Sequence, residues 1–242
     1  MKTTEPANAE LAPLFREYTD AAQWTAGAVA EIVAGLQASL QRTQRARLVL
    51  SGGSTPAPVY RALAGQPLDW AKVEVALVDE RWLPVGDADS NTQLIRDTLL
   101  TEHARTARFQ PMLVSGRNLA ESVAAANRNF LPASVLVLGM GPDGHTASLF
   151  PHLRGFSEAV VSGSPYLAVD ASHCAGAGAW AQRISLSPFG LSQATTRILL
   201  IRGEHKRRVL DQAMAGTDCA ELPIRLVLAS PGPALHVHWC PD

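Results

Sequence analysis

Four short polar segments of this 242-residue chain carry residue types that can do chemistry. Each follows an apolar run directly, at 51–56 (SGGSTP), 79–81 (DER), 141–145 (GPDGH) and 203–206 (GEHK). Histidine exchanges protons near neutral pH, while glycine turns, lysine and arginine bind anions. Together the four segments predict one crevice that can hold an anion and move a proton.

Segment 51–56 has the composition of an anion-binding turn. Gly52 and Gly53 allow a sharp turn and a close backbone approach to a ligand. Ser54 or Thr55 can cap the next helix, whose first N–H groups would face the anion. The nucleotide-binding pattern G-x-x-x-x-G-K-[ST] is absent, so a nucleotide P-loop is excluded. A plain strand–turn–helix junction remains the alternative interpretation.

His145 is the candidate general base, and we expect it at the start of a helix beside Asp143. Either Asp143 or Asp79 is expected to orient its imidazole. Segment 139–144 also fits G-x-G-x-x-G, the dinucleotide fingerprint. Because it follows a late strand and places Asp143 where a pyrophosphate would lie, no dinucleotide site is predicted.

Three cationic side chains complete the candidate site. Arg183 and Lys206 are candidates for the two cations that a phosphate dianion prefers. Arg81 is a candidate donor to a developing oxyanion. An ordinary surface ion pair is the alternative for segment 79–81, and such pairs contribute little to stability.

These residues need a scaffold, and apolar runs alternate along the chain with amphipathic segments. The alternation predicts an α/β fold, a mostly parallel sheet with helices on both sides, formed by one domain over residues 1–242. The carboxyl ends of its strands would bring the polar segments together. Strands are predicted at 47–51, 73–79, 134–140, 196–202 and 224–230, and helices at 20–41, 56–64, 91–100, 118–130 and 204–214.

Two further segments have a distinct composition. Residues 171–179 are rich in glycine and alanine and are predicted to form a flexible loop. The run 235–239 alternates apolar and polar residues, which places His236 and His238 on one strand face. An exposed face of an edge strand is favoured there over a metal site, because no third ligand is visible.

Composition excludes several classes of protein. The net charge of −1 and the lack of a basic stripe argue against a nucleic-acid partner. The N-terminal 15 residues have no continuous apolar stretch typical of a secretory signal, and no run is long enough to span a membrane. Three widely spaced cysteines predict neither a zinc site nor a disulfide framework, and they fit a cytoplasmic location.

Taken in order, the motifs LVLSGGSTP, VDERWLP, DSN, LGMGPDGHTASLFP, RISLS and GEHK resemble those of the 6-phosphogluconolactonases, which are related to glucosamine-6-phosphate deaminases. The resemblance covers nearly the whole chain. It implies a single α/β domain of the glucosamine-6-phosphate deaminase/isomerase type. It also implies hydrolysis of 6-phospho-D-glucono-1,5-lactone in the oxidative pentose phosphate pathway, with no metal, organic cofactor or obligate protein partner.

The resemblance also implies roles for matching residues. His145 corresponds to the general base. The phosphate loop corresponds to Gly52, Gly53, Ser54 and Thr55, with Arg183 and Lys206 as cations, and the sugar pocket to Asp79, Arg81 and Asn91. One departure is the lead-in to Arg183, residues 176–182 (GAGAWAQ), where the family often has a proline-rich stretch with a lysine.

Three alternative functions follow from the same residues. The first is a glucosamine-6-phosphate deaminase. By resemblance, such enzymes carry a glutamate shortly after the histidine, but no acid lies between His145 and His152. A non-catalytic sugar-phosphate sensor would use the same crevice without needing an imidazole beside two acids. A serine hydrolase is disfavoured because no G-x-S-x-G elbow is present.

Overall fold

The computed structural model describes residues 12–242; residues 1–11, on which most of the secretory-signal argument rests, lie outside the described part. Within it, seven strands form one sheet in which every pairing is parallel. The order is β1 (Leu14–Glu17), β10 (Leu235–Cys240), β9 (Ala194–Arg202), β6 (Ala133–Gly139), β2 (Ala46–Leu50), β3 (Val73–Leu77) and β5 (Arg108–Phe109). The predicted α/β class is confirmed.

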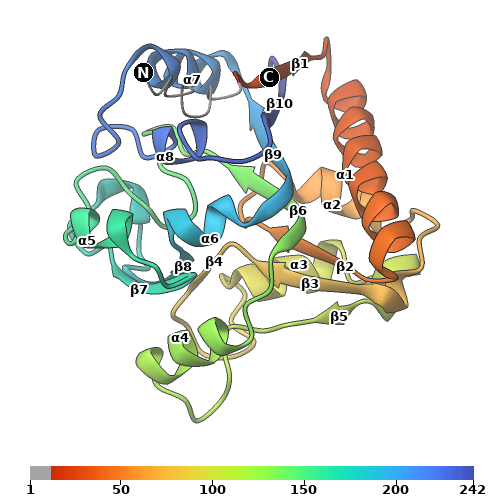
Figure 1. The fold of residues 1–242 in the computed structure, drawn as a ribbon, viewed down its shortest axis with the longest axis horizontal. Coiled ribbons are helices and arrows are strands. Elements are labelled where there is room, and N and C mark those ends of the chain that lie inside the picture. The colour runs from red at the N-terminus through yellow and green to blue at the C-terminus, as the bar shows by residue number, and fades with distance from the viewer. Residues whose placement is uncertain (1–11) are drawn as a thin grey trace, which may run out of the picture.

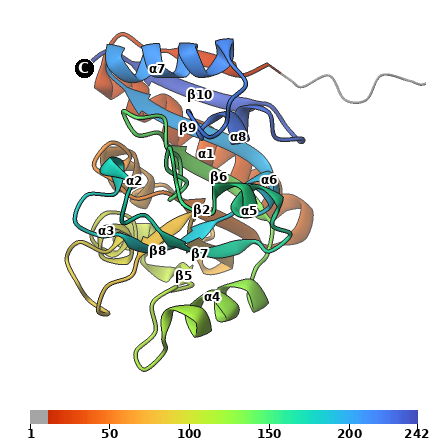
Figure 2. The same cartoon turned by 90° about the vertical axis from the view of Figure 1, so that its left-hand side faces the viewer.

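A second, antiparallel sheet lies beside the first and was not predicted. It has the order β4 (Asp79–Arg81), β8 (Gln182–Leu186), β7 (Tyr166–Asp170). In Figure 1 this small sheet lies on the opposite side of the large sheet from α1 (Ala21–Thr43), and Figure 2 shows β7 and β8 in front of the large sheet. Segment 171–179 connects these two strands and contains a short 3₁₀ helix, η3 (Ala175–Ala177).

The remaining helices flank the sheets. They are α2 (Ala57–Ala64), α3 (Asn91–Thr98), α4 (Leu119–Arg128), α5 (Phe156–Val161), α6 (Pro188–Ser192), α7 (Glu204–Ala215) and α8 (Arg225–Leu228), with 3₁₀ helices η1 (Trp70–Lys72) and η2 (Glu102–Thr106). None of the helices within residues 12–242 is both long and apolar enough to cross a membrane.

The central strands are apolar because both faces of the sheet are covered. Every residue of β2 is buried, and Trp24, Ile32 and Leu36 of α1 are fully buried in the same core. Burying one such side chain contributes roughly 1.5–3 kcal/mol, so the core fixes the strand register. The strand ends, and the polar segments that follow them, are thereby held in place.

Several helix predictions are confirmed with their local causes. Asp20 caps α1 through a hydrogen bond from the Gln23 N–H, and Ser90 caps α3 in the same way. Asn118 and Glu121 form a reciprocal capping box at the start of α4. These caps satisfy N–H groups that the helix itself leaves without partners.

Three local predictions are wrong. Residues 224–230 contain the short helix α8 (Arg225–Leu228) rather than a strand, and its buried Arg225 donates to the carbonyls of Gln212, Ala213 and Asp218. Neither Ser54 nor Thr55 caps α2, whose cap position is Pro56 with no side-chain hydrogen bond.

The third concerns the last strand. β10 is not an exposed edge, because it pairs with β1 on one side and β9 on the other. His238 is fully buried, and both His236 and His238 hydrogen-bond the carboxylate of Glu31 on α1. Within residues 12–242, no group of three or more His, Cys, Asp or Glu side chains could hold a metal ion.

Candidate active site

A crevice of about 210 Å³ opens at the carboxyl ends of the central strands. The chain runs from β2 to β3 and β5 on one side, then returns to β6 on the other side of β2. Ligands of open α/β sheets bind at this kind of reversal in strand order. The crevice is lined by Ser51, Gly52, Gly53, Ser54, Thr55, Pro56, Asp79, Arg81, Asn91, Gly139, Met140, Gly141, His145, Ala147, Arg183, Leu200 and Lys206.

The structure therefore brings together every candidate site residue except Asp143 as lining of one crevice. Asp143 lies behind His145 instead of lining the crevice, and its Oδ1 is 2.6 Å from His145 Nδ1. The same Oδ1 accepts the His145 backbone N–H at 3.2 Å. Asp143 thus fixes both the ring and the main chain of the histidine.

His145 does not start a helix, so that prediction is wrong. It lies in an irregular turn in which the Gly141 N–H donates to the His145 carbonyl at 2.9 Å, and the next helix begins only at Phe156. The turn is built by Asp143 and its neighbouring glycines and needs no helix. No helix dipole therefore acts on the imidazole from its own segment.

The imidazole has one engaged and one available nitrogen. Nδ1 bonds Asp143, and within residues 12–242 the structure records no hydrogen bond to Nε2. The ring packs on Phe150, with centroids 4.6 Å apart, and its side chain is 23% exposed. With an ionised Asp143 accepting from Nδ1–H, Nε2 is the basic nitrogen that can reach water in the crevice.

Asp143 is held in its ionised form. Burial acts to raise the pKa of this carboxyl, but the hydrogen bond from His145 and the charge of that ring outweigh burial and lower the pKa. Asp79, the other candidate partner, does not hydrogen-bond His145. Its Oδ2 accepts from Ser148 Oγ at 2.6 Å and lies 3.8 Å from Arg183 Nη1.

The glycine–serine turn has two positions that only glycine fits. At Gly53 the φ angle is +96°, in the left-handed region. A Cβ at Gly52 would lie 1.9 Å from Asn91 Oδ1, so the amide side chain closes on the bare backbone. The Asn91 amide in turn donates to the Asp79 carbonyl at 2.8 Å. Turn and crevice wall are therefore packed together.

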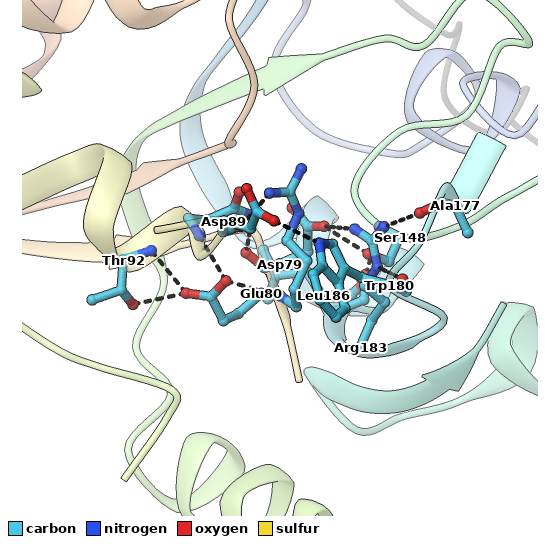
Figure 3. A network of polar contacts seen from close by, with 12 residues as sticks. Asp79, Glu80, Asp89, Thr92, Ser148, Ala177, Trp180, Arg183 and Leu186 are labelled. Atoms are coloured by element: carbon cyan, nitrogen blue, oxygen red, sulfur yellow. Dashed lines mark hydrogen bonds and ion pairs between the residues drawn. The ribbon is translucent and has the colours of Figure 1, made fainter. Parts of the chain in front are cut away.

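The two predicted phosphate cations differ in their surroundings. Lys206 lies near the N-terminus of α7, and burial lowers the pKa of its ammonium group while Asp242 partly offsets this. Arg183 is 6% exposed, and its Nε and Nη2 donate to the carbonyls of Trp180 and Ala177 (Figure 3). Two donors of Arg183 are thus directed at a loop rather than at the crevice.

Sequence reasoning missed Glu80 as a functional residue although it lies inside the DER motif. Glu80 is fully buried and accepts from the N–H groups of Arg81, Asn91 and Thr92 and from Thr92 Oγ1. Figure 3 shows its carboxylate directed at the start of α3. The sequence did contain a signal for this role. Glu80 follows Asp79 in the strand, so its side chain must point to the opposite face from that of Asp79.

These features define an α/β protein whose crevice, at the reversal of strand order, joins an anion-binding turn to a histidine–aspartate pair. The family model described as "Glucosamine-6-phosphate isomerases/6-phosphogluconolactonase" matches residues 19–239. The chain belongs to this family.

Relatives and solved structures agree with the assignment. A 6-phosphogluconolactonase of Xylella fastidiosa (strain Temecula1) is 45% identical over 226 residues, covering 92% of this chain and 94% of the relative. One of Pseudomonas putida is 39% identical, with 93% and 92% covered. The crystal structure of a 6-phosphogluconolactonase from Shewanella baltica superposes with a TM-score of 0.87 at 29% identity, covering 96% of this chain and all of that one.

Proposed function

We propose that this chain is a 6-phosphogluconolactonase that hydrolyses 6-phospho-D-glucono-1,5-lactone to 6-phospho-D-gluconate in the oxidative pentose phosphate pathway. The observation that carries the proposal is the crevice shared by the 51–56 turn, Lys206 and the free edge of His145. An anion site and a proton-transfer group in one crevice suit a substrate with a phosphate at one end and an ester at the other. The family and its curated relatives support the same reaction.

Binding would begin at the phosphate. The backbone N–H groups of the turn and the Lys206 ammonium supply donors and charge for a dianion. Arg183 borders the same crevice and adds positive charge, although its strongest hydrogen bonds go to the loop. This remote binding energy holds the lactone carbonyl beside His145.

The chemical step is addition of water followed by ring opening. His145 Nε2 takes a proton from water as the water oxygen bonds to C1, and the C1 carbonyl becomes an oxyanion. Arg81 is the proposed donor to this oxyanion. When the carbonyl re-forms, the bond from C1 to the ring oxygen breaks, and the proton on Nε2 passes to that oxygen. Asp143 keeps Nδ1 protonated throughout.

We further propose that the whole chain acts as one domain in the cytoplasm. Its substrate is a free phosphorylated sugar lactone, and its reaction uses no metal or organic cofactor, nucleic acid, membrane or obligate protein partner. The near-neutral charge of the chain and its three free cysteines support this setting.

The first test is His145→Ala. Lactone is generated by excess glucose-6-phosphate dehydrogenase, its hydrolysis is followed through 6-phosphogluconate formation, and spontaneous hydrolysis is subtracted. General-base catalysis contributes about 10²- to 10⁴-fold, so the variant should lose a factor in this range in kcat with little change in KM. His103→Ala, an exposed histidine on η2, is the matched control and should keep wild-type rates.

Three results would each contradict part of the proposal. Near-normal turnover by the folded His145→Ala protein would remove the histidine from the mechanism. A wild-type protein that binds sugar phosphate without accelerating hydrolysis would be a sensor. Ammonia release from glucosamine 6-phosphate would instead identify a deaminase.

A further inference from the structure

Gly176 lies directly against the acid of the proton-transfer pair. A Cβ placed on this residue would be 2.3 Å from Asp143 Oδ2 and 3.3 Å from His145 Nδ1. The first distance is far inside van der Waals contact. Gly176 does not have a positive φ angle, so its backbone conformation is open to alanine. Glycine is therefore required here because Asp143 occupies the space that a Cβ would need, and not because of the backbone conformation.

The segment that carries Gly176 is anchored from β8. Arg183 Nε donates to the Trp180 carbonyl at 2.6 Å, and Nη2 donates to the Ala177 carbonyl at 2.7 Å, as Figure 3 shows. Both bonds come from a nearly buried cation, and hydrogen bonds from charged donors are stronger than neutral ones. The backbone on the C-terminal side of Gly176 is thus tied to a strand of the small sheet.

A second anchor joins the same segment to the loop before α3. Trp180 Nε1 donates to Asp89 Oδ2 at 3.2 Å, and the Asp89 carbonyl accepts from Arg81 Nη1. At its base the segment is closed by a hydrogen bond from the Ala171 N–H to the Ala181 carbonyl at 2.9 Å. A backbone fixed at three points resists moving away from Asp143.

We propose that residues 174–181 form a positioning wall for the histidine–aspartate pair, and that Gly176 is a positioning residue that acts on the reaction through Asp143. This inference rests on the proposed function for its kinetic consequence. The wall accounts for the glycine-rich composition of residues 176–182, the segment where the sequence departs from the pattern often seen in the family.

The wall restricts rotation of the Asp143 carboxylate away from His145. The Asp143 side chain is 31% exposed, and a partly exposed carboxylate can rotate away from its partner towards water. With Gly176 on one side and the imidazole on the other, that rotation is restricted. Gly141 confines the pair from a further direction, because a Cβ there would lie 2.2 Å from His145 Nδ1 and 2.6 Å from Asp143 Oδ1.

The thiol of Cys174, in the wall, also indicates that the wall lies close to Asp143. Burial, and then the negative charges of Asp143 and Asp170, raise the pKa of Cys174. The other charged side chains around the crevice are Asp79, Arg81, Arg183 and Lys206. None of them hydrogen-bonds His145 within residues 12–242, so a change at Asp143 should dominate any change in the protonation of the imidazole.

The test is Gly176→Ala, with Gly163→Ala as control because a Cβ at Gly163 meets nothing within 4 Å. A displaced Asp143 should lower kcat about 10- to 100-fold and leave KM nearly unchanged. The acidic limb of the kcat pH profile should move to lower pH, since a neighbouring carboxylate stabilises the imidazolium. An unchanged kcat and an unchanged pH profile would overturn the inference.

A double-mutant cycle with Asp143→Ala separates positioning from general damage. If the methyl group acts by striking the carboxylate, Gly176→Ala should cost neither further kcat nor further thermal stability once Asp143 is alanine. Losses that simply add in the double variant would contradict the wall. Should the single variant fail to fold, recovery of folding in the double variant supports the proposal, and continued misfolding refutes it.

A readout independent of turnover keeps this inference apart from the proposed function. Nitrogen NMR shifts of the His145 ring report the hydrogen bond at Nδ1 directly. We expect the Nδ1 signal to differ between wild type and Gly176→Ala but not between wild type and Gly163→Ala. An unchanged Nδ1 signal would refute the wall even in a fully active lactonase, whereas an inactive wild type with a changed signal would refute only the function.

Discussion

At His145, the choice of acidic partner decides which nitrogen can act. Asp143 occupies Nδ1, so proton transfer falls to Nε2, on the edge that has no bonding partner among residues 12–242. Asp79, which the sequence left as an equal candidate, is engaged by Ser148 and lies beside Arg183. Asp79 itself lines the crevice, and its carboxylate lies beside Arg183 in the crevice wall.

Lys206 gives a prediction that separates anchoring from chemistry. Lys206→Met removes the cation that we assign to the substrate phosphate while keeping a long, unbranched side chain. A charge-assisted hydrogen bond is worth roughly 1.5–3 kcal/mol, so kcat/KM for the phosphorylated lactone should fall about 10- to 100-fold, mainly through KM. The measurement is steady-state kinetics with the phosphorylated and the unphosphorylated lactone in parallel.

The unphosphorylated substrate is the internal control for Lys206. Its hydrolysis should be as slow in Lys206→Met as in wild type, because it has no phosphate to lose. Lys72→Met, in a surface pair with Asp69, should change neither substrate. Equal losses on both lactones would contradict the assignment of Lys206 to the phosphate.

The polar segments that follow the apolar runs meet at one crevice, as the sequence predicted, and Asn91, which only the family resemblance pointed to, lines the same crevice. What the sequence could not supply was the direction of each side chain. The sequence predicts Arg183 as a cation that binds phosphate, yet two of its donors hydrogen-bond the carbonyls of residues three and six positions earlier in the chain. That outcome depends on how segment 174–181 folds back, which no local pattern encodes.

At the scale of elements, the junction between β4 and α3 depends on one buried acid. The Glu80 carboxylate joins the N–H group of Arg81 to those of Asn91 and Thr92. Burial raises its pKa, and its four donors partly offset that effect. Since Asp79, Arg81 and Asn91 all line the crevice, Glu80 fixes the spacing between two parts of its wall.

We therefore predict that Glu80→Gln lowers the free energy of unfolding by about 2–4 kcal/mol. The amide turns one acceptor into a donor that faces N–H groups, and leaves buried donors without a partner. Urea unfolding measures the loss. Glu121→Gln is the control, because Glu121 serves the α4 capping box at an exposed position and should cost at most about 1 kcal/mol. Equal losses in the two variants would contradict the central role of Glu80.

The elements that the sequence predicted are those with strong local signals. α1, α3 and α4 carry caps and amphipathic faces, and β2, β3, β6 and β9 each contain a near-continuous apolar run. The run 224–230 has the same apolar content but only four helical residues, a length at which composition cannot separate helix from buried strand. β8 was not predicted because Arg183 and Ser185 interrupt its apolar residues, and β7 was not predicted because it is a run of only five residues.

At the scale of the whole molecule, the terminal elements are joined by an ionic cluster far from the crevice. Glu31 of α1 bonds His236 and His238 of β10, and it pairs with Arg16 of β1 at 2.7 Å. His238 also shares a 2.9 Å hydrogen bond with Tyr18, just after β1. One carboxylate therefore connects the first strand, the first helix and the last strand.

This cluster makes stability depend on pH. Burial acts to raise the pKa of Glu31, but the hydrogen bond from His238 and the charges of His236, His238 and Arg16 outweigh it and lower the pKa from 4.5 to about 2. A carboxyl with a lowered native pKa stabilises the fold above its unfolded value. That contribution is lost as the pH falls from 4.5 towards 2.

Glu31→Gln should therefore be less stable than wild type above pH 4.5, by on the order of 2–3 kcal/mol, and the difference should shrink as the pH is lowered towards 2. Urea unfolding of both proteins across that window measures it. Glu17→Gln is the control, since Glu17 pairs with Arg207 at the surface and such pairs contribute about 0–1 kcal/mol. A deficit in Glu31→Gln that stays constant with pH would show that shape, rather than the buried charge, joins the terminal strands.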